Sequence, residues 1–413
     1  MNFQYHGGFL VKIIGIVSEY NPFHNGHLYQ VQKSIQDLNA DGVVAVMSGN
    51  FVQRGFPAIF NKWIRAEMAI RGGVNLVIEL PTYFATSSAE QFAKGAVELL
   101  DATGVVDHLS FGSEYDDLST LKQIAELLVS PTEPFQEMLS STLKLGLSFP
   151  SARAAAIHHA LPELQSKLDM NQSNVILGVE YLKALLQLNS EIQPHLVKRQ
   201  GNAYHDPSLN SPYVSATAIR RAYFEDAKLL SEGEWMPNAI REIMLNTTAH
   251  ANRIEHFEDM ILYAIRSKTT EGLSKIRDVN EGLENKILSA AIRAKDYKSL
   301  VDQIKSKRYT MTRINRILMG ILLQIEDEQY AFSDHAYFRI LAFDETGKRI
   351  IKKMKKSTDV PILTNINKFR NVIDSNPLLQ LDIRATDIYH LTQRDKNGGL
   401  DYLKRPFDLD SFK

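Results

Sequence analysis

The sequence predicts an α/β fold, in which a doubly wound parallel sheet is followed by a mostly helical C-terminal domain. Short apolar and β-branched runs alternate with helically spaced segments over the first half of the 413-residue chain. A strand, helix and strand order that repeats at intervals of about 30 residues is typical of a parallel sheet with helices on both faces. Helical patterns dominate from about residue 230. We therefore expect a sheet domain over 1–230 and a mainly helical domain over 231–413.

The spacing of apolar residues places the individual elements. The expected strands are Val11–Val17, Gly42–Met47, Asn75–Leu80, Val106–Phe111 and Ile192–Lys198. The clearest helices are His27–Leu38, Lys62–Arg71, Ala89–Leu100, Ser151–Ala160, Asn174–Leu188, Pro237–Leu245, Phe257–Ser267, Gly282–Ala294 and Leu300–Ser306. The tail adds two strand-like runs, Phe338–Phe343 and Val360–Leu363. Doubly wound sheets bind ligands at the carboxyl ends of their strands, so the loops after the strands are the candidate site.

Composition excludes several kinds of site. The chain has a net charge of −1 and no cysteine. It therefore lacks disulfides, thiolate zinc sites, iron–sulfur clusters and a cysteine nucleophile, and the absence of cysteine fits a cytoplasmic protein. No apolar run approaches the ~20 residues that cross a bilayer, and the N-terminus lacks the pattern of a signal peptide. We expect a soluble, cytoplasmic protein without a membrane contact, in which nucleic-acid binding would depend on local basic patches.

The most informative short motif is His24-Asn25-Gly26-His27, which follows the first strand and begins a helix. Free backbone N–H groups and the helix dipole attract an anion to such a position. Gly26 would let a phosphate approach the backbone, and each imidazole can donate a hydrogen bond as negative charge develops. The alternative is a surface turn with two incidental histidines. The strand before the motif and the helix after it favour a phosphate site.

The string YNPFHNGH resembles the His-x-Gly-His signature of the nucleotidyltransferase superfamily, whose sheet is Rossmann-like. Its enzymes cleave an NTP between the α- and β-phosphates by positioning the reactants and neutralising charge. Small members usually read Phe-Asp-Pro-x-His-x-Gly-His, and Asn21 replaces that aspartate here. The resemblance implies that a nucleotide binds after the first strand.

The superfamily has a second phosphate motif late in the sheet domain. Ser215-Ala216-Thr217-Ala218-Ile219-Arg220 is similar to its Ser-Ser-Thr-x-x-Arg form. Ser215, Thr217 and Arg220 would then hold the β- and γ-phosphates, with Arg220 as a bidentate clamp. Ser215 could instead be a plain helix N-cap. The run Lys352–Ser357 imitates a lysine-rich form of the motif, but it lies outside the sheet domain, and we reject it.

Longer strings make the resemblance more specific. GIVSEYNPFHNGHLYQ, VMSGNFVQRGFPAIFNKWIRAEMA, NLVIELP, FGSE, NVILGVEYL and SATAIR occur in this order and resemble the bacterial tRNA(Met) cytidine acetate ligase family, and KRYTMTRINRIL extends the likeness. The resemblance implies two steps. Acetate attacks the α-phosphate of ATP, giving acetyl-adenylate and pyrophosphate. N4 of the wobble cytidine in elongator tRNA(Met) then takes the acetyl group, giving N4-acetylcytidine and AMP.

The resemblance also implies the residues of the site. The catalytic residues would be His24, His27, Ser215, Thr217 and Arg220. The residues that match the family's ATP-binding positions are Val17, Ser18, Glu19, Tyr20, Asn21, Pro22, Phe23, His24, Asn25, Gly26, His27, Leu28, Tyr29, Gln30, Gly112, Asn174, Arg199 and Gln200. Asn174 could equally be a helix N-cap. Mg2+ would be carried with ATP, and we predict no metal-binding residue because no acidic cluster has metal-ligand spacing.

Two further groups have alternative interpretations. Gln53, Arg54 and Lys62 follow the second strand and could face acetate or phosphate, but a plain loop and an exposed helix surface would explain Arg54 and Lys62 as well. The main candidates for tRNA contact are Lys305, Lys307, Arg308, Arg313 and Arg316, with Tyr309 as a stacking ring. Lys348–Lys356 is a second basic run. Solvated helix faces are the alternative for both runs, and no protein partner is evident.

Two other functions share parts of this pattern. A small-molecule adenylyl- or cytidylyltransferase would use the same motifs, but such enzymes usually lack a long helical half with basic runs. A non-enzymatic RNA-binding protein could retain the nucleotidyltransferase fold. The intact His24, His27, Ser215, Thr217 and Arg220 argue against that alternative.

Overall fold

A computed structural model gives the structure of the protein and describes residues 12–164, 169–170, 172–200, 211–306, 309–326 and 336–412. The strands of its main sheet are β1 (Ile13–Ser18), β2 (Gly42–Ser48), β5 (Leu76–Leu80), β6 (His108–Ser113), β7 (Gln193–Lys198), β8 (Phe338–Phe343), β9 (Ile362–Leu363) and β10 (Phe407–Asp408). A separate hairpin of β3 (Phe51–Val52) and β4 (Phe56–Pro57) follows β2.

The first five strands of the main sheet are parallel, in the order β5-β2-β1-β6-β7. β1 pairs with β2 from Ile13 opposite Gly42 to Ser18 opposite Met47. After β1, the chain adds β2 and β5 on one side of β1. It then crosses over and adds β6 and β7 on the opposite side of β1. This reversal beside β1 is where doubly wound sheets bind ligands, and the predicted doubly wound parallel sheet is confirmed.

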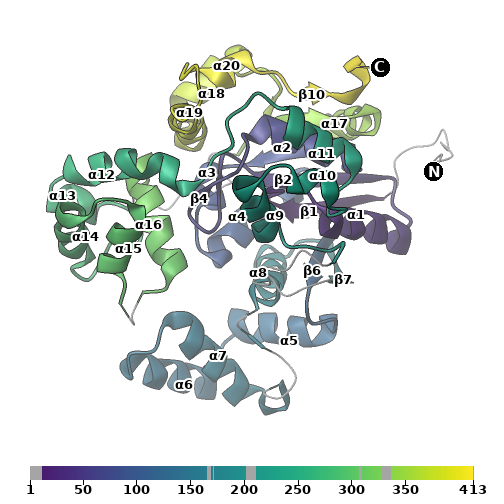
Figure 1. The fold of residues 1–413 in the computed structure, drawn as a ribbon. Coiled ribbons are helices and arrows are strands. Elements are labelled where there is room, and N and C mark those ends of the chain that lie inside the picture. Colours follow the sequence, from purple (N-terminus) through teal and green to yellow (C-terminus); the bar gives the residue numbers. More distant parts are fainter. Residues whose placement is uncertain are drawn as a thin grey trace.

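Helices cover the sheet and extend beyond it. Their bounds are α1 (Asn25–Leu38), α2 (Lys62–Arg71), α3 (Thr82–Ala85), α4 (Ala89–Ala102), α5 (Leu118–Val129), α6 (Glu133–Lys144), α7 (Phe149–Ala160), α8 (Ser173–Leu188), α9 (Ala216–Glu225), α10 (Leu229–Glu232), α11 (Asn238–Asn246), α12 (Glu258–Arg266), α13 (Thr270–Ser274), α14 (Leu283–Arg293), α15 (Tyr297–Ile304), α16 (Met311–Leu323), α17 (Glu345–Ser357), α18 (Arg370–Ser375), α19 (Pro377–His390) and α20 (Leu400–Leu403). Helices α12–α16 form a bundle beside the sheet, and α5–α7 lie below it (Figure 1). In the ranges given above, no helix has both the length and the apolarity that a membrane span requires.

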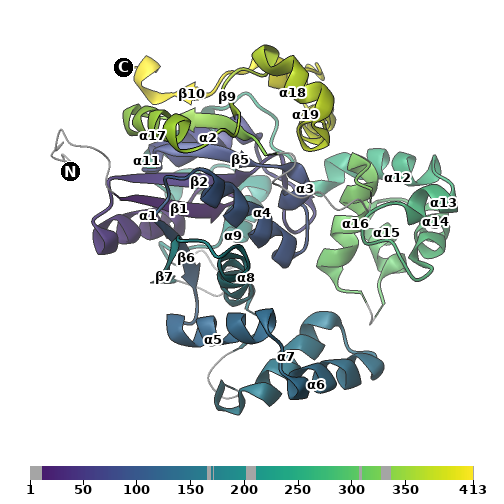
Figure 2. The ribbon, with the colours of Figure 1, turned by 180° about the vertical axis from the view of Figure 1, so that it is seen from behind.

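Alternate residues of each strand pack on opposite faces of the sheet. Ile14 and Ile16 of β1 lie in a core that includes residues of α1, α2, α9 and α11. Ile13 lies in the core on the other face, with residues of α4 and α8. Figures 1 and 2 show these two faces. Because both faces are covered, β1 and β2 are apolar along most of their length, and all of β2 is buried.

The last part of the chain returns to the sheet. β8 pairs antiparallel with β5, and β9 and β10 pair with β8. The region after residue 230 is mostly helical, as predicted, and the strand-like runs of its tail extend the sheet beyond residues 1–230. The division into domains at residue 230 stays a prediction. Without β8, β5 would be an exposed edge strand. The fully buried Ile340 and Leu341 of β8 cover it.

Candidate active site

The two histidines of the short motif lie at the first turn of α1. Nδ1 of His24, the N-cap residue, accepts a hydrogen bond from the Gly26 N–H at 3.0 Å. Nδ1 of His27 accepts one from the His24 N–H at 3.2 Å. The two bonds satisfy N–H groups near the helix start. A Cβ at Gly26 would lie 2.8 Å from Cε1 of His24, so this glycine makes room for the imidazole itself.

Both imidazoles are neutral and share one tautomer. Burial, with smaller effects from the charges of Arg199 and Arg220, lowers the pKa of His24 to about 3. Burial also lowers the pKa of His27 well below its usual value, with smaller effects from His24 and Arg199. A ring nitrogen that accepts a hydrogen bond carries no proton, so each neutral ring carries its proton on Nε2. The site therefore has two uncharged Nε2–H donors.

Two arginines supply the positive charge. Arg199 follows β7 and lines the same pocket as the histidines. Arg220 of α9 donates to the Asn21 carbonyl at 2.7 Å and to Oγ1 of Thr217 at 3.2 Å. The hydroxyl of Ser215 accepts a hydrogen bond at the start of α9. Ser215 is thus the helix N-cap that the sequence offered as the alternative to a phosphate contact. Arg220 thus joins the second motif to the loop that leads into α1.

A pocket lies where these elements meet. It is lined by His24, Gly26, His27, Tyr29, Gln30, Gly112, Val197, Arg199, Gln200, Tyr213, Val214 and Ser215. The rings of Tyr29 and Tyr213 meet edge to face, 5.9 Å apart. Neither Tyr213 nor Val214 was singled out in the sequence, because neither belongs to a motif. The pocket lies beside β1 and β6, at the switch point of the sheet.

Other predicted site residues support the pocket from behind or lie beside it. The residues outside the lining are Val17, Ser18, Glu19, Tyr20, Asn21, Pro22, Phe23, Asn25, Leu28, Asn174, Thr217 and Arg220. Tyr20 and Phe23 belong to the core under α1. The Asn25 amide donates to the carbonyls of Pro212 (3.0 Å) and Glu234 (2.6 Å) and fastens the start of α1 to the second motif's segment.

Glu114, directly after β6, holds two of the predicted ATP-binding residues. Its Oε1 accepts a hydrogen bond from Nδ2 of Asn174 at 2.5 Å and lies 3.5 Å from Nε of Arg199. Asn174 therefore faces Glu114 from the first turn of α8 and is not the N-cap. A Cβ at Gly112 would lie 3.3 Å from Cγ of Arg199. The string FGSE contains Glu114, but only the spatial proximity of α8 and β7 reveals its role.

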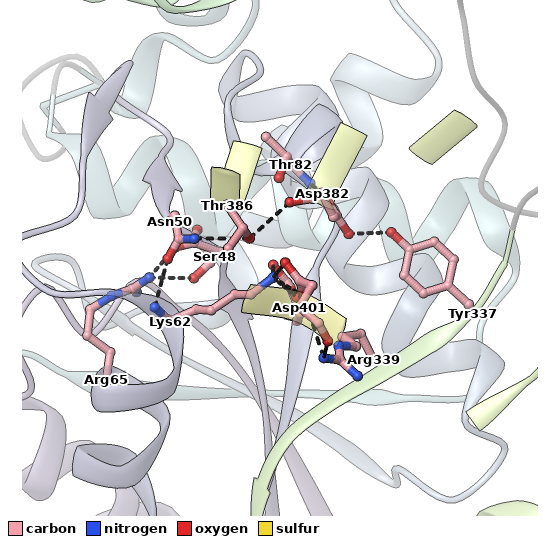
Figure 3. Close-up of polar contacts among 12 residues, drawn as sticks. Ser48, Asn50, Lys62, Arg65, Thr82, Tyr337, Arg339, Asp382, Thr386 and Asp401 are labelled. Carbon is pink, nitrogen blue, oxygen red and sulfur yellow. Dashed lines mark hydrogen bonds and ion pairs between the residues drawn. The ribbon is translucent and has the colours of Figure 1, made fainter. Parts of the chain in front are cut away.

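Lys62 does not face the pocket, and both interpretations of it from the sequence are wrong. Its Nζ lies 2.8 Å from Oε2 of Glu79 and 3.0 Å from Oδ1 of Asp401, and all three side chains are at most 1% exposed. Burial lowers the pKa of Lys62, but Asp401 and Glu79 raise it overall. Figure 3 shows this buried cluster, which continues through Asp401 to Arg339. Lys62 thus joins α2 to the sheet and to the C-terminal segment.

Arg65 is a buried residue that the sequence did not reveal as part of the site. Its guanidinium donates to the carbonyl oxygens of Glu19 (2.5 Å), Phe60 (2.9 Å), Ser48 (3.1 Å) and Gly49. Burial lowers its pKa to about 10. Arg65 therefore holds the loops that follow β1 and β2, including the loop that leads to the histidines.

The β3–β4 hairpin contacts the sheet and α8. The Gln53 N–H donates to Oε1 of Glu19 at 3.1 Å, and its side-chain amide donates to the Ser87 carbonyl at 3.3 Å. Arg54 donates to Oγ of Ser173 at 2.9 Å. Neither Gln53 nor Arg54 lines the pocket beside His24 and His27, and their contact with acetate or phosphate stays a prediction.

Of the basic residues predicted to contact tRNA, the structure describes Lys305 at the C-cap of α15 and Arg313 and Arg316 in α16. Arg313 donates to the 278–280 loop, at 3.1 Å and 2.9 Å. Arg316 is half-buried, and burial lowers its pKa to about 10. Lys305 is exposed. Lys307 and Arg308 lie outside the described residues. The role of these residues in tRNA binding stays a prediction.

The lysine-rich run Lys352–Ser357 lies in α17. The N–H of Asp344, the N-cap of α17, donates to the Asn75 carbonyl at 3.1 Å, just before β5. This is the amino edge of the parallel strands, whereas the pocket lies at their carboxyl edge. The geometry supports the rejection of this run as the phosphate motif.

The family described as HIGH Nucleotidyl Transferase matches residues 11–401. The fold and the histidine pair are those of this class of enzyme. The tRNA(Met) cytidine acetate ligases of Thermoanaerobacter sp. (strain X514) and Alkaliphilus metalliredigens (strain QYMF) are 40% and 42% identical to this chain, covering 95% and 96% of it and 98% and 99% of their own lengths. Two crystal structures of Thermotoga maritima TmcAL match this chain at 35% identity, and each match covers 97% of this chain and 100% of the other. The TM-score is 0.89 for the apo form and 0.86 for the form bound with α-thio ATP. The chain belongs to the tRNA(Met) cytidine acetate ligase family.

Proposed function

We propose that this chain activates acetate with ATP and transfers the acetyl group to N4 of the wobble cytidine of elongator tRNA(Met). The relatives are named for this ligase activity, and one solved relative is bound with α-thio ATP. The observation that carries the proposal is the neutral pair of His24 and His27 in one pocket with Arg199.

In the first step an acetate oxygen attacks the α-phosphorus of ATP, and the bond to the bridging oxygen of the β-phosphate breaks. Negative charge grows on the phosphate oxygens, to which the Nε2–H groups of His24 and His27 would donate. Arg199 and Arg220 would neutralise the triphosphate, and the dipole of α1 adds to the attraction. Pyrophosphate leaves, and acetyl-adenylate remains without a covalent bond to the protein.

Magnesium would enter with ATP as part of the substrate. Among the residues that the structure describes, no three His, Asp or Glu side chains are grouped so that they could hold a metal ion. These described residues thus offer no ligand set for a resident ion, and no step in this proposal uses one.

In the second step the cytidine N4 attacks the acetyl carbon and AMP leaves. The predicted basic residues would hold the tRNA backbone by phosphate contacts. These residues are Lys305, Lys307, Arg308, Arg313 and Arg316.

The test is mass spectrometry of the nucleosides of bulk tRNA after incubation with the protein, ATP, acetate and Mg2+, together with a pyrophosphate assay. We expect N4-acetylcytidine only when ATP and acetate are both present, and pyrophosphate release that depends on acetate. Pyrophosphate release that ignores acetate, or tRNA without N4-acetylcytidine, would overturn the proposal.

A further inference from the structure

Glu19 is the first residue after β1, beside the nucleotide pocket but not in its lining. Its Oε1 accepts a hydrogen bond from the Gln53 N–H at 3.1 Å, and its backbone carbonyl accepts one from Arg65 at 2.5 Å. The backbone and one carboxylate oxygen are thus held by separate partners. Such double support fixes the position of a side chain, as a substrate contact requires.

The second carboxylate oxygen of Glu19 is left for a ligand. The side chain is partly exposed, and within the described residues Oε2 makes no hydrogen bond and Glu19 makes no ion pair. Glu79 of β5, by contrast, is paired with Lys62, and Oε1 of Glu114, directly after β6, contacts both Asn174 and Arg199.

The charge of Glu19 decides which substrate it suits. A carboxylate repels acetate and the triphosphate. It does suit a hydrogen-bond donor. The exocyclic N4 amine of cytosine donates to carboxylates, whereas uracil has the acceptor O4 at the same place. Tyr181 of α8 lies nearby, since the charge of Glu19 adds to burial in raising the pKa of the Tyr181 hydroxyl.

We propose that Glu19 recognises the cytosine amine and accepts the proton that N4 loses during acetyl transfer. The inference rests on the proposed function. The N4 lone pair forms the bond to the acetyl carbon, and the bond from that carbon to the AMP phosphate oxygen breaks. The electron pair leaves with AMP, and the proton passes from N4 to Oε2 of Glu19 and then to solvent.

Glu19→Gln separates the two steps. The glutamine can still accept the Gln53 N–H, so acetate-dependent ATP–pyrophosphate exchange should stay within about threefold of wild type. Acetyl transfer to tRNA should fall by about 100-fold or more, as expected when a general base is lost. The matched control is Glu126→Gln, an exposed residue of α5, which should change neither rate. An equal loss of both rates would assign Glu19 to ATP or to structure, and unchanged transfer would also refute the proposal.

A competition assay between tRNAs measures the preference for C over U at the wobble position. This preference would not change if Glu19 had only a structural role. Transcripts of the tRNA with C or U at the wobble position would be compared as inhibitors of acetyl transfer to bulk tRNA. Wild-type protein should prefer C, and Glu19→Gln, which presents a donor in place of Oε2, should lose or reverse that preference. An undiminished preference for C would overturn the inference. A wild-type protein without acetate-dependent exchange would instead refute the proposed function.

Discussion

The imidazoles of His24 and His27 stack with centroids 3.8 Å apart, and neither ring carries a charge. Two protonated rings at this distance would repel each other, and burial would penalise both charges. The backbone N–H groups of the first turn of α1 bond Nδ1 of both rings. The helix start therefore sets the tautomer, and the neighbouring arginines provide the charge that the rings lack.

Replacing His27 by alanine should lower acetate-dependent ATP–pyrophosphate exchange by about 10²–10³-fold, because one donor to the charge that develops at the phosphate is lost. The measurement is the exchange rate at saturating ATP, with circular dichroism to verify the fold. His159→Ala is the control, since His159 is exposed on α7. A folded His27→Ala protein with full activity would refute the role of this ring.

Gly26→Ala tests whether the position of the His24 ring matters. The added Cβ would lie 2.8 Å from Cε1 of His24 and would displace the ring from its N-cap position. Loss of the helix cap should lower the free energy of unfolding by about 1 kcal/mol, and displacement of the Nε2–H donor should lower the exchange rate by up to about 10²-fold. In the control Gly320→Ala the nearest atom, a methyl carbon of Ile276, is 3.4 Å away. Equal effects of the two substitutions would contradict the explanation.

Glu114→Gln should weaken ATP binding more than it slows catalysis. Glutamine removes the charge that holds Arg199, and a hydrogen bond to a charged group contributes about 1.5–3 kcal/mol. We expect KM for ATP to rise about tenfold or more in steady-state assays, with a smaller change in kcat. The opposite pattern, a lower kcat at unchanged KM, would show that Glu114 acts on the reacting atoms.

Lys62→Met should destabilise the protein by about 3–5 kcal/mol, because it leaves Glu79 and Asp401 buried without their cation. Urea unfolding of this variant and of Lys352→Met, an exposed lysine of α17, would measure the difference. The control should change the free energy of unfolding by at most about 0.5 kcal/mol. A Lys62→Met protein that keeps its stability but loses acetate-dependent exchange would show that Lys62 contacts substrate after all.

Short-range sequence patterns predicted the parts of the fold that are determined by residues close together in the sequence. Both faces of β1 and β2 are buried, so their apolar runs are visible in the sequence, and the histidine motif lies where the strand–helix pattern placed it. Strand β8 was visible as an apolar run, but its pairing with β5 was not, because β5 and β8 are far apart in the sequence.

The missed features of the site have no local signal. The contact of Lys62 with Asp401 spans 339 positions, so no spacing rule connects them. Glu114 and Arg65 act through partners on other elements, namely α8 and β7 for Glu114 and the loops after β1 and β2 for Arg65. A charged residue that is fully buried looks the same in the sequence as an exposed one until its partners are placed.

Both histidines should act as neutral Nε2–H donors, and nitrogen NMR of the protein labelled with 15N-histidine would show the protonation state of each ring. Burial disfavours the charged ring, which lowers the pKa of His24 to about 3 and that of His27 well below 6.5. Both rings should therefore remain neutral from pH 8 down to pH 5, with the proton on Nε2, and His27→Ala and Gly26→Ala assign the two signals. An imidazolium signal from either ring that appears as the pH falls through about 6.5, or a proton on Nδ1, would contradict the account.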